Sequence, residues 1–204
     1  MNCDFLKLRE KVREYMSEKR YLHTLGVEAA AREIANYCLP DRADELAVAA
    51  LLHDIAKELP YELQYDYARN SGFAVTEDDL ATRSALHSFA APYLVKKDFP
   101  NLVTDDILSA VFNHTVGAPD MSLFDEIVFV ADYIEENREY QHCKQMRKFL
   151  FGNLSLDATE IENTRALHRT LVQILDFTIE YLIVKNMKVN ERTFLTKNAF
   201  LPLI

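Results

Sequence analysis

Glycine is scarce in this sequence. The chain of 204 residues contains four glycines, where average usage would give about fourteen. They are too far apart to form a G-x-G-x-x-G or G-x-x-x-x-G-K motif, so the glycine-rich loops that bind phosphate through backbone amides are excluded. Tight hairpin turns also depend on residues that tolerate positive φ. The shortage of glycine therefore favours helices over hairpin-rich β structure.

Cysteine is rare as well, and basic residues are outnumbered. Cys3, Cys38 and Cys143 are odd in number and far apart, so we expect reduced, mostly buried thiols and no disulfide or cysteine zinc site. Lys plus Arg is 23 against 32 for Asp plus Glu, a formal net charge of −9. Nucleic acid and anionic membranes are therefore not expected partners. An anionic substrate would need a local cluster of positive charge.

The sequence has no long uncharged apolar run. Its first residues, MNCDFLKLREKVREYM, carry charges where a signal peptide needs an apolar stretch. The most apolar late segment, LVQILDFTIEYLIV, contains Asp176 and Glu180 and is too short to span a bilayer. We expect a soluble, cytoplasmic protein that does not enter the membrane.

Helical periodicity is present along the whole chain. Val27, Ala30, Ile34 and Cys38 form one apolar stripe, which Pro40 closes. The next segment, ELAVAALLHDIAKELP, is apolar on all sides through its middle, which is typical of a helix buried on several faces. We expect this helix to carry its histidine and aspartate near its C-terminal end.

The second half continues the pattern. Thr104 and Ser122 look like N-caps of two further helices, and Pro92 should kink or shorten the helix before them. From about residue 140 we expect two more helices and a tail, NERTFLTKNAFLPLI. The predicted fold is an all-α bundle of roughly eight helices in a single domain, 1–204. Its core is expected at about 18–138, with the C-terminal helices of 139–204 packing on it.

Six polar residues occur in apolar or small-residue helical contexts. A buried carboxylate is costly unless it is paired or bound to a metal, and histidine with carboxylate is the ligand set for zinc, iron or manganese. A lone histidine on an apolar face is more often a satisfied core residue, and a lone aspartate can cap a helix or pair with arginine. The convergence of six favours a metal site: His23, His53, Asp54, His87, His114 and Asp132. His142 and His168 stand among charged residues and are interpreted as facing solvent.

Five motifs carry a resemblance to a known family: RYLHTLGV, AALLHDIAKELP, ALHSFAAPYLV, NHTVGAPDMSLFDEIVFVADYIEENR and LDFTIEYLI. The order of His23, His53-Asp54, later histidines and Asp132 resembles the HD-domain metal phosphohydrolases. The longer motifs resemble the YqeK family of symmetrical bis(5′-nucleosyl)-tetraphosphatases, from about Arg20 to Arg138 and more loosely beyond. The resemblance implies an HD-domain helical bundle.

The resemblance also implies roles for the residues. One iron ion would be bound by His23, His53, Asp54 and Asp132, with manganese or another divalent metal as the alternative. His87 and His114 would complete a second metal position bridged by Asp54, or contact phosphate if one ion is bound. Catalytic roles fall to Asp54 and Lys57. The residues implied in substrate binding are His23, Asp54, Lys57, His87, Asn113, His114, Asp132, Arg138 and Thr178.

Two of these residues have ordinary alternatives. Lys57 could be a solvated surface lysine near a helix end, and Arg138 could be a surface arginine that pairs with Glu135. As phosphate contacts, Lys57 would act as a point charge and Arg138 would offer a bidentate fork.

The implied activity is symmetrical hydrolysis of diadenosine tetraphosphate to two ADP, which would make the protein a phosphoric anhydride hydrolase. One alternative is an HD-domain phosphatase that acts on a nucleoside monophosphate or a guanosine polyphosphate. Another is a helical module that binds nucleotide without turnover. The expected partner is a small dinucleoside polyphosphate, with no nucleic acid and no membrane. A homodimer through the apolar tail 200–204 stays open, as does the number of metal ions.

Overall fold

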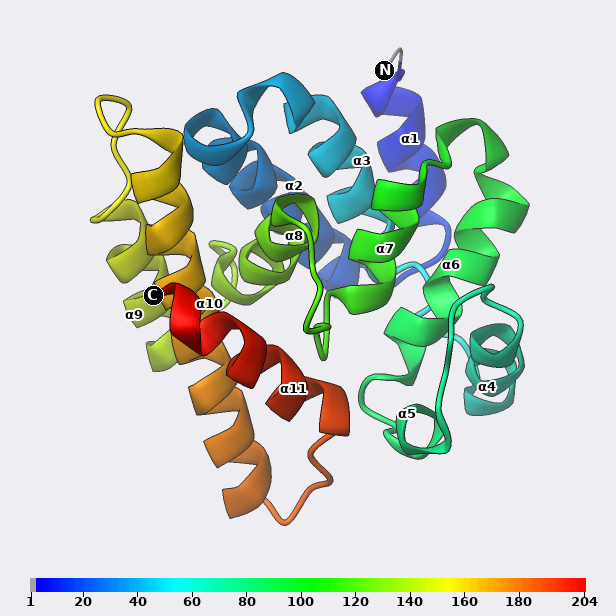
Figure 1. Ribbon diagram of the computed structural model, residues 1–204. Coiled ribbons are helices and arrows are strands. Elements are labelled where there is room, and N and C mark those ends of the chain that lie inside the picture. The colour runs from blue at the N-terminus through cyan, green and yellow to red at the C-terminus, as the bar shows by residue number, and fades with distance from the viewer. Residues whose placement is uncertain (1–2) are drawn as a thin grey trace.

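The computed structural model describes residues 3–204, which fold into α-helices and 3-10 helices without a strand (Figure 1). This confirms the all-α class. The described residues form eleven α-helices, more than the roughly eight expected, and the segment around residue 195, expected to be a tail, is among the additional ones. The helices are α1 (Phe5–Arg13), α2 (Glu18–Cys38), α3 (Ala43–Leu52), α4 (Tyr61–Arg69), α5 (Glu77–Ala81), α6 (Leu86–Asp98), α7 (Asp105–Asn113), α8 (Leu123–Ile134), α9 (Gln141–Phe151), α10 (Glu160–Val184) and α11 (Glu191–Phe200), with 3-10 turns η1 (Pro40–Arg42), η2 (Pro100–Leu102) and η3 (Leu201–Leu203).

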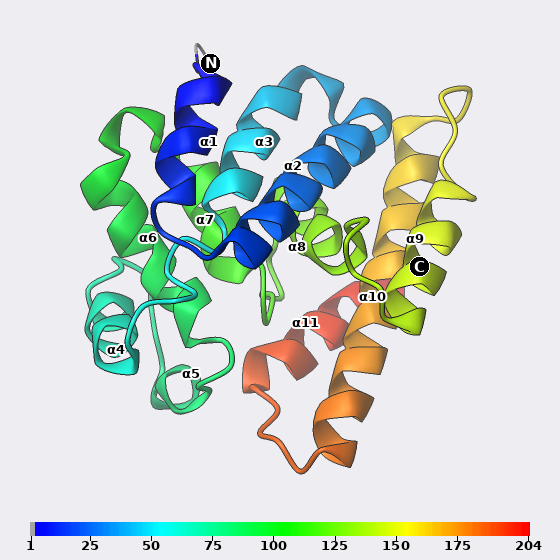
Figure 2. The same cartoon turned by 180° about the vertical axis from the view of Figure 1, so that it is seen from behind.

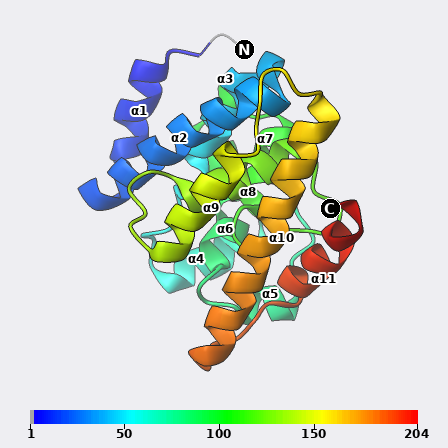
Figure 3. The same ribbon diagram turned by 90° about the vertical axis from the view of Figure 1, so that its left-hand side faces the viewer.

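The core lies where α2, α3, α7 and α8 pack together. Helix α3 is buried from Leu46 to Leu52, as its apolar sequence predicts. Helices α4, α5 and α6 lie on one side of this core and α9 and α10 on the other, as Figures 1 and 2 both show. The long α10 packs against α8 and runs beside α9, while α11 folds back along it (Figure 3). The helices of the core thus hold the candidate ligands from several directions.

Several helix starts follow the expected capping chemistry. Thr76 and Asp79 form a capping box at the start of α5, and the Thr104 side chain accepts a hydrogen bond from the backbone of Ile107. Ser122 begins α8 as its N-cap. Each cap satisfies backbone N–H groups that the first helical turn leaves without partners.

Regular helical structure in α3 ends earlier than predicted. The helix stops at Leu52, and the next residues pass through consecutive turns, with a hydrogen bond from Lys57 N to Asp54 O at 2.9 Å. His53 Nδ1 lies 2.6 Å from the carbonyl oxygen of Ala50. A continuing helix would use this oxygen as the acceptor for a backbone N–H. The metal-ligand candidates of this segment therefore lie in a turn. Helix α6 does continue through Pro92.

The C-terminal tail is the other difference, because most of it forms a helix. Asn190 caps α11 by accepting a hydrogen bond from Arg192 N at 2.9 Å. The Arg192 side chain reaches the buried Asp79 of α5 at 3.0 Å, and Thr196 packs against Gly117. Contacts distant in sequence thus stabilise a segment whose own pattern is weak.

The described residues hold three free thiols and no helix suited to crossing a bilayer. Cys38 and Cys143 are buried and Cys3 is partly buried, and all three thiols are free. None of the helices between residues 3 and 204 combines the length and apolar character needed to cross a membrane.

Candidate metal centre

Five segments bring six potential ligands to one place. His23 comes from α2, His53 and Asp54 from the turn after α3, and Asp132 from α8. The remaining two come from the first turn of α6 and the end of α7, and are His87 and His114. All four histidines and Asp54 are buried. The structure therefore collects in one centre the residues that the sequence singled out.

Contacts at Nδ1, on the side of the ring away from the centre, fix the orientation of three histidines. The ring Nδ1 of His53 lies 2.6 Å from Ala50 O, and that of His114 lies 2.7 Å from Val111 O. His23 Nδ1 lies 3.1 Å from a Glu135 carboxylate oxygen. Because these oxygens only accept hydrogen bonds, each Nδ1 carries a proton, which leaves Nε2 as the ring nitrogen that faces the centre. This is the orientation that histidine metal ligands need, and His23 Nε2 can bind a metal once it has lost its own proton.

The first ligand group has the spacing of a coordination sphere. His23 Nε2 lies 3.0 Å from Asp132 Oδ1, and His53 Nε2 lies 3.4 Å from Asp54 Oδ2. Two ligands that bind one ion at about 2.1 Å are separated by roughly 3.0 to 3.4 Å. The buried Nε2 atoms of His23 and His53 make no hydrogen bond within the described part of the chain. A divalent metal ion would satisfy these two ring nitrogens.

A second group shares one residue with the first. Asp54 Oδ1 lies 3.1 Å from His87 Nε2 and 3.6 Å from His114 Nε2, and the two ring nitrogens are 3.2 Å apart. The two carboxylate oxygens of Asp54 thus face different sets of histidines. This geometry suits a carboxylate between two neighbouring cation positions.

Three cationic side chains lie next to the centre. Arg20 Nη1 is 2.7 Å from Asp54 Oδ2, and Arg138 Nη2 is 2.6 Å from Asp132 Oδ1. Lys57 Nζ lies 3.0 Å from His87 Nε2, and burial lowers the pKa of Lys57. These groups form the local positive cluster that an acidic protein needs to hold an anion.

The carboxylates of the centre are held in their charged form. Burial alone would raise the pKa of Asp54, but the neighbouring rings of His53 and His114 keep that pKa well below its usual range. Burial opposes ionisation of Asp132 too, and Arg138 outweighs it, so the pKa of Asp132 is also well below its usual range. Both carboxylates are therefore available as anionic ligands.

The histidines differ in charge state. Burial alone would lower the pKa of His23, but the carboxylates of Asp132 and Glu135 raise it to about 9. Burial and the Lys57 ammonium lower the pKa of His87 to about 3. The side of the centre next to His23 is thus the one that attracts positive charge, while His87 is neutral and has a lone pair to offer.

Three cavities that share lining residues adjoin the centre. The inner cavity, of about 230 Å³, is bounded by Asp54, Lys57, His114, Asp132 and Thr178 among others. The aromatic cavity, also of about 230 Å³, is bounded by Tyr133, Arg138, Tyr140, His142, Cys143, Phe177, Thr178 and Tyr181. The outer cavity, of about 650 Å³, is bounded by Lys19, Arg20, His23, Lys57, Glu135, Asn137, Arg138, Glu139 and Tyr140. Arg138 borders all three.

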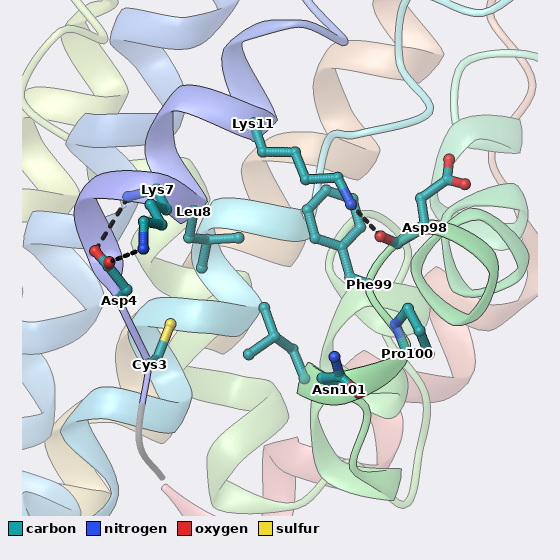
Figure 4. Close-up of a pocket in the computed structure, with 10 residues that line it drawn as sticks. Cys3, Asp4, Lys7, Leu8, Lys11, Asp98, Phe99, Pro100 and Asn101 are labelled. Atoms are coloured by element: carbon teal, nitrogen blue, oxygen red, sulfur yellow. Dashed lines mark hydrogen bonds and ion pairs between the residues drawn. The ribbon is translucent and has the colours of Figure 1, made fainter.

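A further cavity lies apart from the centre, between α1 and the segment after α6 (Figure 4). It measures about 250 Å³ and no histidine lines it. Lys7 pairs with Asp4 at 3.2 Å, and Lys11 donates to the backbone carbonyl of Asp98. Its polar groups are thus engaged with one another, and it offers no comparable ligand set.

Most predicted site residues meet at the centre or its cavities, but one does not. Asn113 points to α7 and α8: its Nδ2 donates to Ser109 Oγ at 3.2 Å, and Ser109 donates to Asp125. Two histidines interpreted as facing solvent are also placed differently. His142 stacks on Tyr140 in the wall of the aromatic cavity. His168 lies 3.1 Å from the buried Glu126.

Sequence reasoning missed two residues that contact the ligands. Arg20 was recognised only as part of a motif, because its contact with Asp54 joins α2 to the turn after α3. Glu135 was considered as a partner of Arg138, but it binds His23 and accepts hydrogen bonds from Asn137 N at 2.7 Å and Asn137 Nδ2 at 3.0 Å. The sequence did contain one signal for Glu135, because it is a carboxylate one helical turn after the candidate ligand Asp132.

The fold and the histidine-aspartate centre agree with comparisons to known proteins. The HD domain family matches residues 20–137, so the chain belongs to the HD domain family. Within that class it belongs with the symmetrical bis(5′-nucleosyl)-tetraphosphatases. A protein of that name from Bacillus subtilis is 34% identical over 188 residues, covering 92% of each chain, and one from Halalkalibacterium halodurans is 28% identical, covering 96% of each.

A solved structure gives the same result for the fold. The crystal structure described as a "predicted HD superfamily hydrolase involved in NAD metabolism" from Clostridium acetobutylicum matches with a TM-score of 0.82. It is 28% identical, and the match covers 99% of both chains. The arrangement of helices around the centre is therefore that of an HD-domain protein along the whole chain.

Proposed function

We propose that this protein is a symmetrical bis(5′-nucleosyl)-tetraphosphatase that hydrolyses diadenosine tetraphosphate to two ADP. The observation that carries the proposal is the candidate metal centre itself, with cationic side chains beside it and an aromatic cavity that shares lining residues with the cavity at the centre. The similarity to tetraphosphatases over nearly the whole chain supports the choice of substrate. Phosphate, metal and nucleoside each have a matching environment.

In this proposal the centre would hold a divalent metal, with iron as the physiological ion. His23, His53, Asp54 and Asp132 would be its ligands, and His87 and His114 would complete a second position. A set of imidazole and carboxylate donors without thiolates suits iron, manganese or zinc. When bound, the metal polarises phosphoryl oxygens and makes water a stronger nucleophile.

The side chains around the centre position the polyphosphate. Arg138 and Arg20 each offer a planar guanidinium that can bind phosphate oxygens in pairs. Lys57 Nζ neutralises charge on the leaving phosphate, since it lies beside His87 at the inner cavity. Asp54 keeps its negative charge between the two histidine groups and orients them.

One nucleoside half lies in the inner and aromatic cavities. Thr178 and Tyr133 border both cavities, which places the aromatic wall next to the centre, where the nucleoside of a bound nucleotide would lie. Phe177 and His142 offer ring faces on which a base can stack, an interaction that every base supports. A water molecule then adds to one inner phosphorus, the bond from that phosphorus to the central bridging oxygen breaks, and the other half leaves as ADP while the water proton is released to solvent.

Product analysis tests this function. The metal-loaded protein is incubated with diadenosine tetraphosphate, AMP, a guanosine polyphosphate and NAD, and products are separated by anion exchange. We expect turnover of the dinucleotide to ADP, and its loss together with the bound metal in His53→Ala. Turnover of a monophosphate or guanosine polyphosphate alone would favour the broader HD phosphatase alternative. Binding of the dinucleotide without hydrolysis would favour a non-catalytic module.

A further inference from the structure

A substrate cut at its centre needs a place for each half. Hydrolysis of the central anhydride leaves one nucleoside diphosphate on each side of the broken bond, so both halves must lie next to the metal centre. The inner and aromatic cavities, bounded on one side by α10, provide for one half. These two cavities do not account for the position of the other half.

The outer cavity also adjoins the centre, and most of its lining residues differ from those of the other two cavities. Its walls come from the first turns of α2, the turn after α3 and the loop after α8, and no residue of α10 lines it. It shares Arg20, Lys57 and Arg138 with the inner cavity. These three cations border both cavities, so a polyphosphate chain that spanned the two would lie along them.

Lys19 adds a free positive charge to the outer cavity. In the described part of the chain, no carboxylate oxygen lies within 4.0 Å of its amino group, whereas Arg20 is paired with Asp54. The Glu135 carboxylate is engaged by His23 and Asn137. Glu139 is the one other acidic group that lines the cavity, and like Lys19 it is exposed. The cavity is therefore suited to an anion although the chain is acidic overall.

The two spaces differ in how they can recognise a nucleotide. The aromatic cavity has the rings of Tyr133, Tyr140, His142, Phe177 and Tyr181. The outer cavity has Tyr140 and the ligand ring His23 alone, and Tyr140 is 69% exposed. Its recognition must rest mainly on phosphate charge, because little ring surface is available for a base.

We propose that the outer cavity binds the second nucleoside diphosphate half of the substrate, with Lys19 contacting its phosphates. This assignment rests on the proposed function. It means that the protein recognises one base in the aromatic cavity and tolerates different groups at the other end of the tetraphosphate.

Charge reversal at Lys19 tests the assignment. We expect Lys19→Glu to raise KM for diadenosine tetraphosphate roughly tenfold, or about 1.4 kcal/mol, with kcat within about twofold of wild type. The same rise is expected with adenosine 5′-tetraphosphate, which lacks the second nucleoside and gives ADP and pyrophosphate when water cleaves the same bond. Lys144→Glu is the matched control, because Lys144 is exposed on α9 and lines none of these cavities. It should leave both constants unchanged.

Equilibrium binding of ADP separates this assignment from the function. The wild type should bind two ADP molecules per chain, and Lys19→Glu should lose one of them, while Phe177→Ala should weaken the other. Unchanged KM values in Lys19→Glu together with a single ADP in the wild type would overturn the assignment, even if the protein hydrolyses the dinucleotide. Two ADP molecules bound without any hydrolysis would instead leave the subsites standing and refute the proposed activity.

Discussion

Gly26 is the position where the smallest substitution should disturb the metal centre. It lies inside α2, three residues after the ligand His23. A Cβ there would overlap the Glu135 carboxylate and lie 2.8 Å from Asn137 Nδ2. The Glu135 carboxylate fixes the His23 ring through Nδ1 at 3.1 Å. Gly26→Ala should therefore displace the residue that orients a metal ligand.

The expected change in the free energy of unfolding is opposite to the change that helix propensity alone predicts. Within a helix, alanine is ordinarily more stabilising than glycine by about 1 kcal/mol. Here overpacking costs about 1 to 3 kcal/mol, so the free energy of unfolding should fall by roughly 1 kcal/mol. Loss of a partner that orients a histidine ligand typically lowers metal affinity or activity about 10- to 100-fold. We expect metal affinity to fall within that range.

Chelator titration with elemental analysis measures the metal affinity, and thermal denaturation of the metal-free protein measures stability. A double-mutant cycle with Glu135→Ala supplies the control. Without the carboxylate in the way, Gly26→Ala should no longer reduce metal affinity further. The reasoning would be refuted if Gly26→Ala alone raised the melting temperature and left metal affinity unchanged.

Three further predictions concern other parts of the molecule. Asp54→Asn should abolish metal retention and lower kcat at least about 100-fold, seen by elemental analysis and product release; full metal content with normal turnover would contradict its role. Burial raises the pKa of Glu126 from 4.5, so its ionisation destabilises the fold as pH rises above that value. Glu126→Gln should consequently gain melting temperature over wild type near neutral pH and not below pH about 4; an equal gain at every pH would argue against this cause. Arg192→Ala should lower the free energy of unfolding by about 3 kcal/mol in denaturant titration, because it leaves the buried Asp79 without its charge partner; a change below about 1 kcal/mol would show that the pair is dispensable.

The helices and the ligand candidates could be predicted from sequence because their signals are local. The apolar face of α2, the continuous apolar run of α3 and the caps Thr104 and Ser122 each depend on residues a few positions apart. The histidines stood out because they occur in apolar surroundings. Such local patterns determine which residues are buried, and buried polar groups must meet partners.

The residues that escaped prediction depend on contacts between distant segments. His168 has polar sequence neighbours, yet α10 places it against the buried Glu126 of α8. Helix α11 was expected to be a tail because its stabilising partner, Asp79, lies more than one hundred residues earlier. Arg20 and Glu135 likewise meet the ligands only after the helices have packed. No spacing rule within one helix contains this information.

The measurement that tests the central claim most directly is the ratio of ADP formed to diadenosine tetraphosphate consumed by the metal-loaded protein. The proposed symmetrical hydrolysis predicts two ADP for each substrate molecule, with no AMP or ATP at early times. It also predicts that the activity disappears when a chelator removes the metal and returns when the metal is restored. Formation of AMP and ATP in equal amounts, or turnover that survives complete metal removal, would contradict the account.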